Sequence, residues 1–382
     1  MLLRAFGPPG APFPEPFDAG AALVAARRFE VSARIVARQG RASLGAELGP
    51  AGAAAAAGFQ RDHAGAAALG LRLLALAGEI AEAAAPHGLP LVLLKFAALE
   101  KAGFAALGAR SACDLDVLAP ENRDGELQQA LLALGWRLSR MPAAEHQLPP
   151  LEHPHGGVAE IHRVVLGVRL DGGASATVAT LERHGLLLPF PDLPGRCAAP
   201  AAHVLAAHAL VHGLGQHGWW PASYSLLKMV ADLIDLGIHT DAALAARAAA
   251  LVERDVPAEE AAAARDLCAA LAAGDDLLAN AEPETGASVL LRHVLAGRLD
   301  AGYAAALRLG FFRSQPSDRA PALRFARSVL AAVFVSNAQI DAIYGPPRGP
   351  LGYLGRRLAR PFDLLGRLGR YAARTVFRRG MV

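Results

Sequence analysis

Cysteine is scarce in this chain of 382 residues. The three cysteines, Cys113, Cys197 and Cys268, lie far apart and are odd in number. That pattern gives neither a disulfide framework nor the paired spacing of a zinc site. We therefore expect reduced thiols and a cytoplasmic protein. Cys113 adjoins Asp114, and we interpret it as a small buried residue on a strand.

Aromatic residues and net charge are also low, at 6% and +3. A charge this small does not by itself indicate nucleic-acid binding. The first twenty residues have no apolar core before their prolines, so they predict neither a signal peptide nor a membrane anchor. The apolar run "SVLAAVFV" late in the chain is too short to span a bilayer. We expect no transmembrane segment.

Alanine makes up much of the 53% hydrophobic content, and alanine favours helix. Apolar residues recur at helical spacing in residues 21–86, and helices are predicted again from about residue 196. Between about residues 70 and 170, short apolar runs bounded by turn signals alternate with helical patterns. The sequence predicts an α+β, mainly helical protein with a small mixed sheet flanked by helical regions.

We expect four parts along the chain. They are an N-terminal arm with helices, an α/β core, a helical domain, and C-terminal helices with a basic amphipathic tail, at residues 1–70, 71–190, 191–310 and 311–382.

The segment "CDLDVLA" places two aspartates, Asp114 and Asp116, inside an apolar run that predicts a strand. Residues two apart on a strand point to the same side, so the two carboxylates project together. Their repulsion and burial need a neutralising partner, and Mg²⁺ suits one or two carboxylates plus phosphate oxygens. The aspartate pair therefore predicts a phosphoryl-transfer site. A turn residue at Asp114 and an edge-strand charge at Asp116 are the simpler alternative.

A second segment, "VAEIHRV", places Glu160 and His162 on one face of another predicted strand. If the two strands are neighbours, Glu160 lies beside the aspartate pair. Three carboxylates on adjacent strands can hold two metal ions.

The ordered set "LVLLKFAAL", "ARSACDLDVLAPEN", "LLALGWRL", "VAEIH" and "LLKMVADLIDL" resembles the uncharacterised bacterial nucleotidyltransferase family within the DNA-polymerase-β-like superfamily. The resemblance covers roughly residues 70 to 240. It implies Mg²⁺-dependent, or Mn²⁺-dependent, transfer of a nucleoside monophosphate from a nucleoside triphosphate to an acceptor hydroxyl that the sequence does not identify.

The resemblance also implies residue roles. Asp114, Asp116 and Glu160 would be catalytic metal ligands, and Glu160 would also serve as general base. The remaining residues would bind the nucleotide: Lys95 and Arg110 by neutralising phosphate charge, His162 by contacting substrate or supporting the site, and Asp232 by lining the pocket or acting structurally. A snorkelling lysine and a helix-end arginine are the ordinary alternatives for Lys95 and Arg110.

One position departs from the family pattern, because Phe96 stands where the family has glycine after the lysine. A side chain there could block the close approach of backbone to phosphate. This leaves open a catalytically degenerate module that binds a nucleotide or a partner protein.

A third alternative rests on His208 and His212, which lie one helical turn apart and could bind a metal with a carboxylate, as in a hydrolase. The simpler expectation is that this helix packs on the core, with His212 or His217 near the rim of the site.

The last segment predicts a basic amphipathic helix with Phe362, Leu365, Leu368, Ala372 and Val376 on one side. Arg367, Arg370, Arg374 and Arg378 fall on the other side. Such a helix could lie on an anionic membrane surface, which would make the protein membrane-peripheral, or bind a partner protein or nucleic acid. A terminal helix packed on its own protein is the alternative.

Overall fold

A computed structural model of the chain describes residues 18–28, 30–139, 146–170, 173–216, 226–252, 265, 268, 269, 271, 349, 351–359 and 362. Its labelled α-helices are α1 (Ala19–Arg28), α2 (Ser32–Gln39), α3 (Arg41–Leu48), α4 (Ala53–Ala84), α5 (Lys95–Lys101), α6 (Asp124–Ala133), α7 (Val178–Arg183), α8 (Ala202–Leu210), α9 (Leu226–Asp235) and α10 (Ala242–Val252). Its strands are β1 (Pro90–Leu93), β2 (Leu115–Leu118), β3 (Arg137–Leu138), β4 (Leu151–Glu152), β5 (Val158–His162), β6 (Leu187–Pro189) and β7 (Arg196–Pro200).

The strands form one mixed sheet of seven, in the order β3-β4-β5-β2-β1-β7-β6. β2 runs parallel to β5 and antiparallel to β1, and β1 runs parallel to β7. The prediction of an α+β, mainly helical protein with a small mixed sheet is confirmed. Strand β2, which carries Asp116, therefore lies between β1, which precedes Lys95, and β5, which carries Glu160 and His162.

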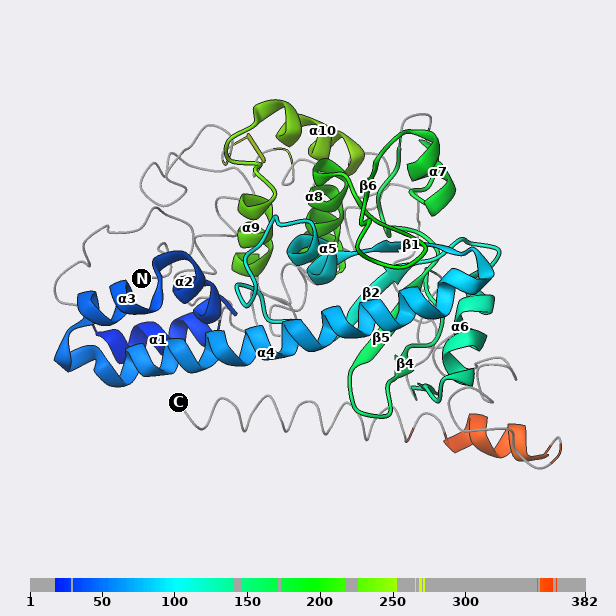
Figure 1. The fold of residues 1–382 in the computed structure, drawn as a ribbon, viewed down its shortest axis with the longest axis horizontal. Helices are drawn as coiled ribbons and strands as arrows, with labels where there is room; N and C mark the ends of the chain where they lie inside the picture. Colours follow the sequence, from blue (N-terminus) through cyan, green and yellow to red (C-terminus); the bar gives the residue numbers. More distant parts are fainter. Residues whose placement is uncertain are drawn as a thin grey trace.

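Helix α4 is the longest element, and its alanine-rich sequence explains its length. Figure 1 shows it running along the molecule, with α1–α3 on its N-terminal half and the sheet on its C-terminal half. Phe59, Leu73 and Ile80 are fully buried on its inner face. By length and composition alone, residues 50–87 could cross a membrane. One face of α4 packs against α1, α2, α6 and β1, and 39% of that apolar window is buried in this structure.

Two predicted local features need correction. Strand β7 lies where helices were expected from residue 196, because its alanine-rich segment is held extended by pairing with β1. Cys113 is exposed at a bend before β2 and is not buried on a strand.

The expected domain boundaries stay predictions, but two of them fall inside continuous structure. Residue 70 lies within α4, and β7 joins the sheet beyond residue 190. Most of the helices predicted between residues 253 and 343, and the basic tail apart from Phe362, lie outside the described residues. A described helix at 351–359 exposes Leu351, Leu354 and Leu358.

Candidate active site

The two polar strands predicted from the sequence are neighbours in the sheet. Asp116 of β2 pairs in register with Glu160 of β5, and Leu118 pairs with His162. On the opposite face of these strands the apolar side chains are fully buried: Leu115, Val117, Ala159 and Ile161. Because alternate residues of a strand point to opposite faces, burying this apolar set fixes the polar set on the other side.

Asp116, Glu160 and His162 converge there. One ligand atom from each lies within 4.8 Å of the others. His162 Nε2 lies 2.8 Å from Asp116 Oδ1 and 3.7 Å from Glu160 Oε2. Two carboxylate oxygens and an imidazole nitrogen are suitable donors for a divalent metal ion, so the residues present fit such an ion.

Asp114 lies just before β2 and outside this three-residue set. Within the described part of the chain, no hydrogen bond or ion pair reaches its carboxylate. Burial, followed by the charge of Asp116, raises the pKa of Asp114. Its role as a metal ligand stays a prediction.

Lys95 supplies the nearest positive charge. It stands at the junction of β1 and α5 with φ at +44°, a sparsely populated conformation for a residue other than glycine. Its Nζ lies 2.6 Å from Asp116 Oδ1, and both side chains are largely buried. Burial opposes the charge on Asp116, but Lys95 and then His162 outweigh it and hold the pKa of Asp116 well below its usual value. The same contact raises the pKa of Lys95 despite the cost of burying it.

Glu160 is in a different electrostatic position. Burial, followed by the charge of Asp116, raises the pKa of Glu160 above its ordinary value. The site therefore holds one strongly ionised carboxylate beside one that takes up protons more readily.

Histidines form a second wall of the site. A pocket of about 180 Å³ is lined by Lys95, His146, Gln147, Glu160, His162, Leu166, His208 and His212. His146 stacks on His162 with ring centroids 5.5 Å apart. Burial lowers the pKa of His208 to about 3, and burial with the charge of His162 lowers the pKa of His146 to about 4. The expectation that His212 lies near the site is confirmed, whereas His217 lies outside the described residues.

His208 and His212 do not build a separate metal site here. Their rings lie 6.1 Å apart. In the described residues, the group of three side chains close enough together to hold a metal ion is Asp116, Glu160 and His162, and it includes neither His208 nor His212. Both histidines belong instead to the pocket beside Lys95, which leaves the hydrolase alternative without support.

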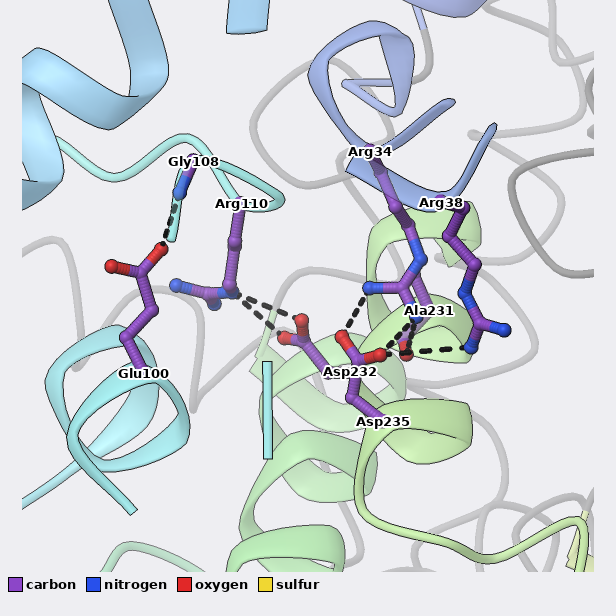
Figure 2. Close-up of polar contacts among 8 residues, drawn as sticks. All are labelled: Arg34, Arg38, Glu100, Gly108, Arg110, Ala231, Asp232 and Asp235. Atoms are coloured by element: carbon purple, nitrogen blue, oxygen red, sulfur yellow. Dashed lines mark hydrogen bonds and ion pairs between the residues drawn. The ribbon is translucent and has the colours of Figure 1, made fainter. Parts of the chain in front are cut away.

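Arg110 and Asp232 are brought together as a buried ion pair, with Arg110 Nε 2.9 and 3.0 Å from the two carboxylate oxygens (Figure 2). Both line a smaller pocket that also includes Lys95 and His208. The pair ties the loop before β2 to α9. Their nucleotide-binding roles stay predictions.

One turn further along α9, Asp235 pairs with Arg34 of α2 (Figure 2). Arg34 also donates to the Ala231 carbonyl at 2.9 Å. Helix α9 therefore connects the N-terminal helices with the loop that leads into β2. Arg34 and Asp235 carry no local sequence signal, because nothing near either residue marks a partner about 200 residues away.

Glu100 of α5 is a further, half-buried carboxyl near the site, and no sequence motif marks it. It accepts a hydrogen bond from Gly108 N–H at 3.1 Å in the loop that carries Arg110 (Figure 2). Burial raises the pKa of Glu100 to about 7. Gly108 adopts φ of +78° close to Ala67 of α4, so this loop is fixed against both helices.

Phe96 does not occupy the site. Its side chain is 2% exposed, and its Cζ lies 3.0 Å from where a Cβ on Gly70 of α4 would be. Phe96 therefore packs toward α4, where Gly70 leaves room for the ring, and it lines neither pocket described above. The steric objection raised by the departure from the family pattern does not apply to this structure.

The match to a protein family agrees with the motifs found in the sequence. Among solved structures, the solution structure of the antibiotic-resistance factor ANT(2'')-Ia is similar over 47% of this chain and 88% of its own, with 17% sequence identity and a TM-score of 0.34. No curated protein matches. Residues 15–248 match the profile of a family described as uncharacterised nucleotidyltransferase. Since this match covers more than half of the chain, the protein belongs to the uncharacterised nucleotidyltransferase family.

Proposed function

We propose that the protein is a Mg²⁺-dependent nucleotidyltransferase that moves a nucleoside monophosphate from a nucleoside triphosphate to an acceptor hydroxyl. The convergence of Asp116, Glu160 and His162 beside Lys95 carries the proposal. Membership of the nucleotidyltransferase family supports the reaction class.

Asp116 and Glu160 would hold the metal through carboxylate oxygens, with His162 as a third donor and Asp114 as a further carboxylate nearby. Mg²⁺ accepts one or two carboxylates together with phosphate oxygens and water, and Mn²⁺ also accepts an imidazole. When bound, such an ion neutralises charge on the phosphate oxygens and makes an attached hydroxyl more acidic.

Glu160 is placed to act as the general base. Its carboxylate lies in register beside Asp116 on the neighbouring strand, so it would be close to an acceptor hydroxyl held at the same metal. It would take the proton of the acceptor hydroxyl as the acceptor oxygen bonds to the α-phosphorus. The bond from that phosphorus to the bridging oxygen breaks, and pyrophosphate leaves with the electron pair.

Lys95 and Arg110 would place positive charge beside the phosphates, with Asp232 orienting Arg110 through Nε. Buried cations stabilise the charge that develops on the transferring group more effectively than solvated ones. Most of the rate enhancement would therefore come from positioning and charge neutralisation.

The proposal is tested with nucleoside triphosphates radiolabelled at the α-phosphate, incubated with the purified protein, Mg²⁺ and a mixture of cellular metabolites and proteins as acceptors. We expect pyrophosphate release and transfer of label with at least one of the four nucleotides. Glu160→Gln should lose both. Glu152→Gln, on the exposed side of the adjacent strand β4, is the matched control and should behave as wild type.

The absence of pyrophosphate release and label transfer with all four nucleotides would contradict the proposal. Equal transfer by Glu160→Gln and wild type would remove Glu160 from the base role.

A further inference from the structure

Two nitrogen atoms, one from Lys95 and one from His162, contact the same carboxylate oxygen of Asp116. Lys95 Nζ lies 2.6 Å from Oδ1, and His162 Nε2 lies 2.8 Å from the same atom. Asp116 is 2% exposed, so water contributes little to the balance of charge around it. The ammonium of Lys95 is therefore the principal counter-ion of this carboxylate.

A divalent cation on the same carboxylate conflicts with that contact. Mg²⁺ binds carboxylate oxygens at about 2.0–2.1 Å. A dication held among Asp116, Glu160 and His162 would lie only a few ångströms from the ammonium, whichever carboxylate oxygen it uses. Like charges at such a distance repel strongly in a buried site. A metal ion on Asp116 therefore weakens the Lys95–Asp116 contact and favours movement of the ammonium away from it.

The side chain of Lys95 borders a pocket into which its ammonium group can move. Its side chain lines the pocket of about 180 Å³ that also contains His146, His208 and His212. Rotation about the side-chain bonds of a lysine moves its Nζ several ångströms without a change in the backbone. In that pocket the ammonium is away from Asp116, and Glu160, the carboxylate that lines the same pocket, would be held as a ligand of the metal, so the charge of Lys95 is available to an anionic ligand.

We propose that Lys95 is a displaceable counter-ion of the metal site, and that metal binding at Asp116 moves its ammonium into the histidine-lined pocket to take a phosphate group of the nucleotide. The inference rests on the proposed function for the identity of the anion. Its consequence is an order of binding: the metal binds before or together with the triphosphate.

Removing the charge of Lys95 should therefore change the affinity for metal and the affinity for nucleotide in opposite directions. Without the ammonium, Asp116 has one competitor fewer, so metal affinity rises. The phosphate loses a cation, so the affinity for the nucleotide falls. A lysine with a purely structural role would not produce this pair of changes.

The test is calorimetric titration of wild type, Lys95→Met and Lys101→Met with Mg²⁺ or Mn²⁺ alone, followed by ATP at saturating metal. Lys101 lies on the same helix α5 and pairs with the exposed Asp192, which makes it the matched control. We expect Lys95→Met to bind metal roughly tenfold more tightly than wild type and to bind ATP more weakly. Lys101→Met should match wild type in both titrations.

Unchanged or weaker metal binding by Lys95→Met would overturn the inference while leaving the proposed function intact, provided that wild type binds metal and ATP. Loss of metal-dependent nucleotide binding in every variant and in wild type would instead count against the proposed function.

A second measurement uses only the wild-type protein, so it gives a result even if Lys95→Met does not fold. The chain has three lysines, Lys95, Lys101 and Lys228, so amine labelling at each can be followed by mass spectrometry. Metal alone should raise the labelling of Lys95 relative to the other two. Unchanged or reduced labelling of Lys95 in saturating metal would overturn the inference.

Discussion

Asp116 is the most constrained charged residue of the candidate site. It is nearly inaccessible to water, it is fixed in register opposite Glu160, and both Lys95 and His162 contact its Oδ1. Burying an ionised carboxylate requires compensation of this kind. Lys95 and His162 hold the pKa of Asp116 low, whereas burial and then the charge of Asp116 raise the pKa of Glu160, although the two carboxyl groups are side by side.

Glu100 gives a prediction for pH dependence. Its pKa of about 7 in the folded protein exceeds the ordinary value of 4.5, so the folded state binds more protons than the unfolded state between these pH values. The contribution of Glu100 to stability therefore falls as pH rises through this window. Urea unfolding should show Glu100→Gln equal to wild type near pH 4.5 and more stable above pH 7. A constant difference between the two proteins at all pH values would contradict this assignment.

At the scale of elements, the junction of β1 and α5 and the helix α9 position the site. The β1–α5 junction presents Lys95 to the sheet face and turns Phe96 toward α4. Helix α9 holds Arg110 through Asp232 and Arg34 through Asp235. The charged residues of the site thus depend on helices that come before and after the sheet in the sequence.

Phe96 should matter for stability and not for nucleotide binding. Because its ring is buried against α4, Phe96→Ala is expected to lower the free energy of unfolding by about 3–5 kcal/mol. Chemical denaturation measures that loss. Nucleotide affinity, measured where the variant is folded, should stay at the wild-type value, and a large gain in affinity would show that Phe96 crowds the phosphate position.

The Arg110–Asp232 pair should behave as a buried ion pair. Asp232→Asn leaves a buried guanidinium without its counter-charge and is expected to lower the free energy of unfolding by about 3–5 kcal/mol. Asp192→Asn, which removes one partner of an exposed pair with Lys101, is the control and should cause no measurable change. Equal effects of the two substitutions in urea unfolding would mean that burial does not strengthen the dependence of Arg110 on Asp232.

The parts that the sequence predicts well are those set by local pattern. The "CDLDV" and "VAEIH" segments each have polar residues two apart among apolar ones, so both strands and the shared face of Glu160 and His162 follow from periodicity. Strand β7 and the grouping of His146 with His208 depend on partners far away in the sequence. Tertiary contacts decide such features, and one sequence does not contain that information.

At the scale of the whole molecule, the N-terminal helices belong to the same structure as the sheet. Helix α4 extends from α1–α3 to β1 (Figure 1), and Arg34 links α2 to α9 through Asp235 (Figure 2). Lys228 of α9 also contacts Glu30, between α1 and α2, at 2.7 Å. These connections agree with a family match that begins at residue 15, well before the sheet.

The most direct test of the account is calorimetric binding of ATP, GTP, CTP and UTP with Mg²⁺ to wild type and to Asp116→Asn. The account predicts Mg²⁺-dependent binding of at least one nucleotide by wild type and its loss in Asp116→Asn, which keeps the shape of the side chain but removes the charge. Binding of no nucleotide by wild type, or equal binding by both proteins, would contradict a nucleotide site centred on Asp116.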